Sequence, residues 1–92
     1  MSPTESRRAL LNDGALAIAS SWAQVWCDNM RREGRMVAGG WPGTLPEARA
    51  RVTAHFDLEL RRLGLRLLTY EELEWVTQAT YRNAKRAWNS AH

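Results

Sequence analysis

The chain has little of what catalytic and metal-binding sites are built from. It contains one cysteine, Cys27, and two histidines, His55 and His92. A single cysteine excludes an intrachain disulfide and favours a reducing, cytoplasmic setting. These few residues supply no CxxC, HxxxH or HxxE spacing from which three or four side chains could hold a metal ion. The sequence therefore predicts neither a metal site nor a cofactor.

Signatures of catalysis are equally scarce. Cysteine chemistry needs a thiolate beside a base, whereas Cys27 lies at the edge of an apolar helical arc, where a small buried thiol is ordinary. The glycines around Trp41 precede a predicted helix, but no Gly-Lys-Ser/Thr follows them, and Pro46 removes an amide from the turn that would face a phosphate. We therefore expect a protein that is not an enzyme.

Long apolar runs are also missing, since none approaches the roughly 18 residues that a membrane span needs. Arg7 and Arg8, followed by apolar residues, loosely resemble a twin-arginine export signal. The polar segment 12–14 interrupts the apolar region that such a signal requires. The sequence thus predicts a cytoplasmic protein without a membrane partner.

What the chain does have is tryptophan and arginine. Its 92 residues include five Trp, and 13 basic residues give it a formal net charge of +3. Lys85 is the only lysine. Each Trp can bury roughly 150–250 Å², so the tryptophans either fill the core or anchor an interface. The length indicates a single helical domain over 1–92, near the lower limit for a self-sufficient core.

Helical periodicity predicts an all-α fold, a small three- or four-helix bundle. Apolar residues fill half of the helical wheel over 15–33, after a shorter helical turn over 3–12. Gly34 is placed to end this first helix. The segment 34–43 holds four of the six glycines and is predicted to be the loop between the first and second helices.

The next two helices carry matching start signals. Thr44 to Glu47 and Thr69 to Glu72 both fit the T-x-x-E capping box, in which a hydroxyl and a carboxylate each satisfy a free amide. Gly64 is expected to end the second helix. Consistent caps and apolar stripes support three helices.

A few apolar residues do not fit the predicted core. Trp75 projects away from the Val76 face of the third helix, on one stripe with Arg82 and Arg86. A Trp on the polar side of a helix is typical of an interface anchor, although arginine stems could equally cover its ring. Leu58 projects to the outer side of the second helix. Trp41 is either a lid over one end of the bundle or part of a contact surface.

We therefore predict a non-enzymatic protein-binding module, an adaptor, regulator or inhibitor, whose partner is another protein or a second copy of itself. The predicted contact residues are Trp75, Arg82, Arg86, Leu58 and Trp41.

The alternative is a small basic regulator that binds nucleic acid. Its contacts would come from arginine groups on all three helices, although the connection between the second and third helices is longer than a helix-turn-helix turn. Besides Arg82 and Arg86, the predicted contacts are Arg31, Arg32, Arg35, Arg61, Arg62, Arg66 and Lys85.

Overall fold

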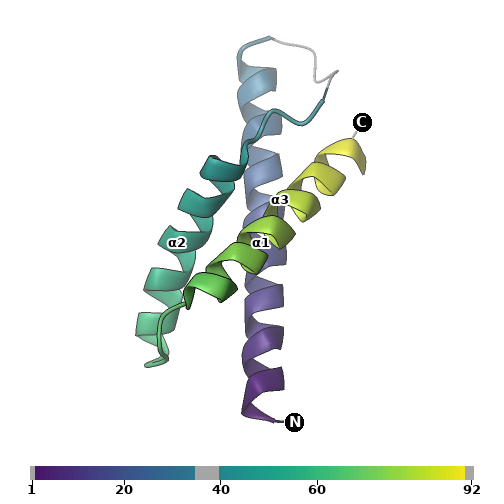
Figure 1. Ribbon diagram of the computed structural model, residues 1–92. Coiled ribbons are helices and arrows are strands. Elements are labelled where there is room, and N and C mark those ends of the chain that lie inside the picture. Colours follow the sequence, from purple (N-terminus) through teal and green to yellow (C-terminus); the bar gives the residue numbers. More distant parts are fainter. Residues whose placement is uncertain (1, 35–39, 91–92) are drawn as a thin grey trace.

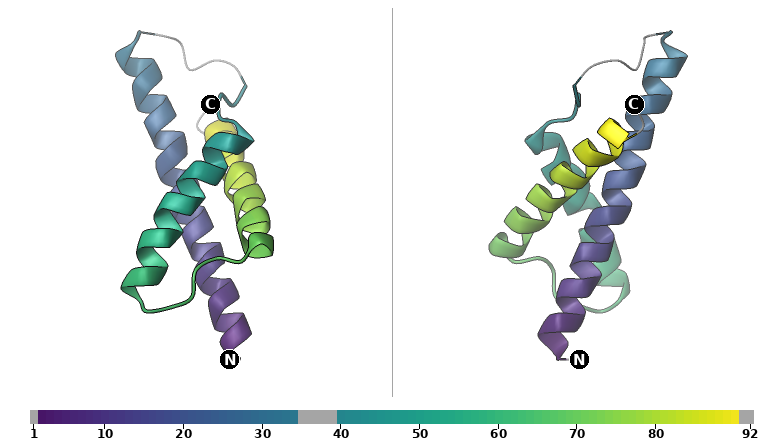
Figure 2. Two further views of the ribbon diagram at one scale, coloured as in Figure 1. Left: turned by 60° about the vertical axis from the view of Figure 1, so that its left-hand side comes forward. Right: turned by 90° about the vertical axis from the view of Figure 1, so that its right-hand side faces the viewer.

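The computed structural model describes residues 2–34 and 40–90 and confirms an all-α fold. Its helices are α1 (Pro3–Arg32), α2 (Leu45–Arg62) and α3 (Tyr70–Ser90), so the bundle has three helices in the described residues (Figure 1). The 30 residues of α1 extend about 45 Å at 1.5 Å per residue, which matches the 46 Å long axis of the molecule. Both ends of α1 extend beyond the two shorter helices, which cross it at an angle (Figure 2).

The predicted break before residue 15 is wrong, because α1 runs unbroken through Gly14. Leu11 and Ala15 are both buried and continue one apolar face across the glycine. The ring of Phe56 packs where a side chain at residue 14 would stand, so that a Cβ there would lie 2.8 Å from Phe56 Cε1. The packing on both sides offsets the roughly 1 kcal/mol that a glycine costs inside a helix. The α1 end near Gly34, which has a φ of +70°, agrees with the prediction.

The predicted hydroxyl caps of α2 and α3 are confirmed, whereas the Glu47 carboxylate accepts from indoles of α1 rather than from the Thr44 amide. Thr44 Oγ1 accepts from the amide of Glu47 at 3.2 Å, and Gly64, with a φ of +69°, ends α2 in a Schellman motif closed by the amide of Leu65. At the start of α3 the capping box is complete. Thr69 Oγ1 accepts from the Glu72 amide at 3.1 Å, and the Glu72 carboxylate accepts from the Thr69 amide at 2.9 Å.

The Glu47 carboxylate ties α2 to α1. It accepts from Trp22 Nε1 and from Trp26 Nε1, the latter at 3.1 Å, and both indoles belong to α1. The Arg51 guanidinium lies 3.7 Å from the same carboxylate and 5.6 Å from the centroid of the Trp22 ring. The Glu47 carboxylate, predicted to cap its own helix, therefore satisfies two indole donors of the neighbouring helix instead.

The core consists of two clusters along α1. The lower cluster joins residues of all three helices, and the upper one is built around tryptophan. In the upper cluster the Trp41 ring packs edge-on against Trp22 and Trp88, with centroids 4.9 and 5.6 Å away. Gly43 leaves room for this packing, because a Cβ there would lie 2.6 Å from Trp22 Cζ2. The lower cluster comprises Leu11, Ala15, Ile18, Val52, Phe56, Leu60 and Val76.

Gly14→Ala should lower the free energy of unfolding by about 1–3 kcal/mol, because the new methyl group meets the Phe56 ring in a filled core. This direction is opposite to the helix preference of alanine. Urea denaturation monitored by circular dichroism measures the change. Ser20→Ala, at an exposed position of the same helix, is the control and should be neutral or stabilising. A stabilising Gly14→Ala would contradict the packing at this crossing.

Candidate interaction surface on α3

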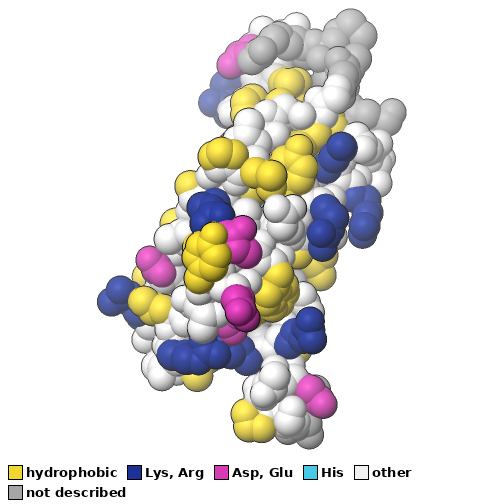
Figure 3. Space-filling model, in the orientation of Figure 1, with side chains coloured by type: hydrophobic (Ala, Val, Ile, Leu, Met, Phe, Trp, Pro, Cys, Tyr) yellow, Lys and Arg dark blue, Asp and Glu magenta, His cyan; other side chains and the backbone are white. Residues whose placement is uncertain are grey.

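The outer face of α3 lies opposite its buried stripe. Val76, Thr80, Ala84 and Trp88 are buried on the inner face. On the outer face a hollow of about 460 Å³ opens beside the first half of the helix, and Tyr70 at its edge is 73% exposed. Figure 3 shows hydrophobic and acidic side chains together over this half, and basic side chains along the second half. The hollow is lined by Tyr70, Glu71, Glu74, Trp75, Gln78 and Arg82.

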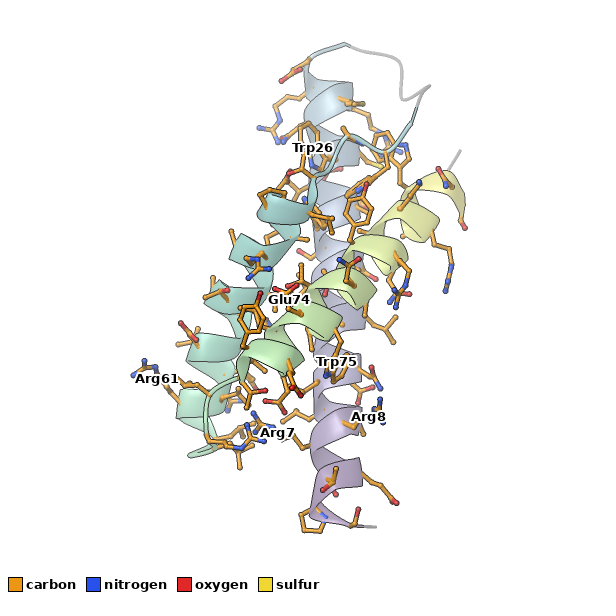
Figure 4. All side chains as sticks on the ribbon, viewed as in Figure 1. Arg7, Arg8, Trp26, Arg61, Glu74 and Trp75 are labelled. Atoms are coloured by element: carbon orange, nitrogen blue, oxygen red, sulfur yellow. The ribbon has the colours of Figure 1, made fainter. Side chains whose placement is uncertain are left out.

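Trp75 is half-buried and occupies the middle of this surface. Its inner side packs against the lower core cluster, and the Arg8 guanidinium of α1 lies 5.8 Å from its ring centroid. Figure 4 shows Trp75 and Arg8 side by side, from α3 and α1 respectively. The indole also borders a second hollow, of about 390 Å³, between α1 and the start of α3. Trp75 is thus held on one side by the core and remains open to two hollows.

Glu72 fixes the first turn of α3 to α1. Its carboxylate accepts from Arg7 at 2.7 and 3.1 Å and from Arg66 at 2.9 Å, in addition to the Thr69 amide. The hydrogen bonds from Arg7, Thr69 and Arg66 outweigh partial burial and lower the pKa of Glu72 from 4.5 to about 2. Arg7 also donates to the backbone carbonyls of 66 and 67, which precede α3. The position of Trp75, one turn further on, depends on this junction.

Glu74 joins the surface to α2. Its carboxylate forms an ion pair with Arg49 of α2, so one wall of the first hollow is held by the neighbouring helix. Figure 4 shows Glu74 on the side of α3 that faces α2. Because both side chains remain more than a third exposed, the pair orders the surface without sealing it.

The second half of the outer face is basic. Arg82, Lys85 and Arg86 are all exposed and line a further shallow hollow near the end of α3. The outer face of α3 therefore combines acidic and aromatic side chains in its first half with basic side chains in its second half.

The structure brings only part of the predicted contact set together. Trp75, Arg82 and Arg86 share the outer face of α3, as their spacing predicted. Leu58, on α2, is 73% exposed but lines neither hollow at Trp75. Trp41 packs into the upper tryptophan cluster, in the arrangement expected of a lid.

The predicted nucleic-acid contacts lie in separate groups. Arg31 and Arg32 are in the last turn of α1, and Arg61 is in the last turn of α2, at the opposite end of the molecule (Figure 1). Two further members have acidic partners, since Arg62 lies 2.6 Å from Glu59 and Arg66 lies 2.9 Å from Glu72. Lys85 belongs to the basic half of α3 and Arg35 lies outside the described residues.

Sequence reasoning missed the residues that α1 and α2 contribute to this surface. In the sequence, Arg7 and Arg8 were interpreted only as part of a possible export signal. Arg7 is 65 residues away from Glu72, its partner in the structure. No periodicity within one helix can reveal a partner on another. The capping box did identify Glu72 in the sequence. Its ion pair with Arg7, in which both side chains are largely buried, depends on how α1 packs against α3.

The described residues were also compared with the requirements of a metal site and of a membrane-spanning helix. Within residues 2–34 and 40–90, no three acidic, histidine or cysteine side chains are grouped as a metal site would require. In the same residues, no helix has the length and hydropathy to cross a bilayer. Comparisons of the chain with models of protein families, with curated proteins and with solved structures find no match.

Acid should weaken the junction at Glu72. Above about pH 4.5 this carboxylate is ionised in both the folded and the unfolded chain, so its stabilising effect is complete. Between pH 4.5 and about 2 only the unfolded chain takes up the proton, and stability falls as the pH falls. Wild type should therefore be more stable than Glu72→Gln at about pH 6, and this advantage should shrink towards pH 2 in urea denaturation.

The control is Glu5→Gln, which alters an exposed glutamate in the first turn of α1. Its stability difference from wild type should be small and should vary little over the same range. Equal pH dependence in the two variants would contradict the proposed role of Glu72.

Proposed function

We propose that this protein is a non-enzymatic protein-binding module, of the adaptor, regulator or inhibitor kind, whose contact surface is the outer face of α3. The observation that carries the proposal is the setting of Trp75. Its ring is positioned by the core and by Arg8, yet it borders two hollows on the surface. An aromatic side chain that is already held in place loses little conformational entropy when a partner covers it.

The residues around Trp75 fit the anatomy of an interface. Tyr70 presents a second aromatic ring with 73% of its surface exposed. Trp, Tyr and Arg are the residues most often found to dominate binding energy, and they act best when a ring of polar groups excludes water around them. Here Glu71, Glu74 and Arg82 supply charged groups at the border of the hollow. Such a surface suits a protein partner with an apolar centre and a charged rim.

Nucleic-acid binding receives less support from the same geometry. A phosphate backbone is tracked by a continuous basic face. The arginine groups lie on different parts of the molecule, and Arg62 and Arg66 are paired with carboxylates. Glu71 and Glu74 would also face a nucleic acid that covered Trp75.

A photo-crosslinking experiment tests the proposal. Benzoylphenylalanine in place of Gln78, inside the first hollow, should give a protein adduct in cells that express the chain, and Thr53, exposed on α2, is the control site. Adding Trp75→Ala should reduce the adduct at least about tenfold while helicity by circular dichroism is kept. When the crosslinking reaction is repeated with the purified partner, the adduct should still form at about 0.5 M salt. Binding through phosphate groups would instead weaken steeply as the salt concentration rises.

Leu58→Ala is the comparison variant, because it removes an apolar side chain that is 73% exposed and lines neither hollow. It should leave the adduct at Gln78 unchanged. Equal yields at Gln78 and Thr53, or an adduct that Trp75→Ala does not reduce, would refute the proposed surface.

A further inference from the structure

The outer face of α3 has the spacing of a helix-pairing seam. Residues 71, 75, 78, 82 and 86 follow one another at intervals of four, three, four and four, which keeps them on one face of an α-helix. All except the half-buried Trp75 are exposed. Intervals of three and four bring successive side chains of one helix face into contact with a second helix. Neither α1 nor α2 covers this line.

The charges along the seam are arranged in two opposite halves. Glu71 and Glu74 stand in the first half of the helix, and Arg82, Lys85 and Arg86 stand in the second. This order of charges complements the macrodipole of α3, and the macrodipole is sufficient to explain it in a single chain. It also makes the face complementary to itself when two copies run in opposite directions.

The geometry points to a second copy of this chain as the partner, bound through antiparallel pairing of the two α3 helices; this inference rests on the proposed function. A two-fold axis passing between Gln78 and Ala79 would bring Glu71 opposite Arg86 of the second copy. The same axis would bring Trp75 opposite Arg82 of the second copy. Because the axis is two-fold, each contact occurs twice, as in other isologous interfaces.

The position of the Trp75 ring is compatible with this antiparallel pairing. Arg8 already lies over the Trp75 ring from the α1 side, and Arg82 of the second copy would approach it from the open side. An arginine over a tryptophan ring is a favourable cation–π contact, and it gains strength as water leaves. Parallel pairing, by contrast, would set Glu71 against Glu71 and Arg86 against Arg86, and like charges across an interface are strongly unfavourable.

The size of the seam indicates a weak dimer. The 21 residues of α3 extend about 31 Å, and a contact through one helix from each copy falls at the small end of specific interfaces. We therefore expect weak self-association that is populated only at high protein concentration.

Charge reversal tests the pairing, with sedimentation equilibrium of the full chain from about 10 μM to 1 mM as the measurement. Glu71→Arg and Arg86→Glu should each weaken self-association at least about tenfold, because each places like charges opposite one another twice. The double variant should regain association, since both contacts are then reversed together. An equimolar mixture of the two single variants should also associate, as each restores the charge that the other has lost.

Matched controls separate this pairing from general effects of charge. Glu5→Arg makes the same change in the first turn of α1, and Arg31→Glu makes the reverse change in its last turn. Both controls should leave self-association unchanged, and circular dichroism should show that every variant keeps its helicity.

Each failure has a distinct meaning. A wild-type chain that stays monomeric to 1 mM overturns the pairing, and so does a double variant or a mixture that fails to recover. If the photo-adduct at Gln78 then has a mass other than twice that of the chain, the proposed function stands with a different partner. Absence of any such adduct, together with a monomeric chain, removes both proposals.

Discussion

The arrangement of the outer face depends on one carboxylate, that of Glu72. It closes the capping box that starts α3, and it accepts from Arg7 of α1 and from Arg66 of the connection before α3. A carboxylate that is only 16% exposed would be costly without partners, and three sets of donors keep it ionised. The start of α3, its attachment to α1 and the place of Trp75 one turn later are thereby fixed together.

The two ends of the molecule use tryptophan in different ways. At the end where α1 finishes, Trp22, Trp41 and Trp88 pack against one another, and Glu47 satisfies the indole donors of Trp22 and Trp26. A short chain gains much of its apolar burial from such rings. Trp75 instead borders two hollows at α3 while its inner side packs against the lower core cluster.

Local signals in the sequence predicted the helix caps, the Schellman end at Gly64 and the outward direction of Trp75, because each depends on residues within about one turn of one another. The continuity of α1 through Gly14 could not be predicted in this way. Glycine is a poor helix former, and only the ring of Phe56, far along the chain, explains why it is accommodated. The contacts of Arg7, Arg8 and Arg49 with α3 likewise arise from tertiary packing. For the same reason the sequence pattern placed Leu58 and Trp41 with Trp75, whereas the structure separates them.

Trp75, on the outer face of α3, is the tryptophan through which we propose that the protein meets its partner, a second copy. The most direct measurement is a dilution series of the ¹⁵N-labelled chain in which the five indole N–H resonances are followed by NMR, with Trp75→Phe to assign one of them. The Trp75 resonance should shift with concentration, while those of Trp22, Trp26, Trp41 and Trp88 should stay in place. Constant positions for all five, or a shift confined to Trp41, would contradict it.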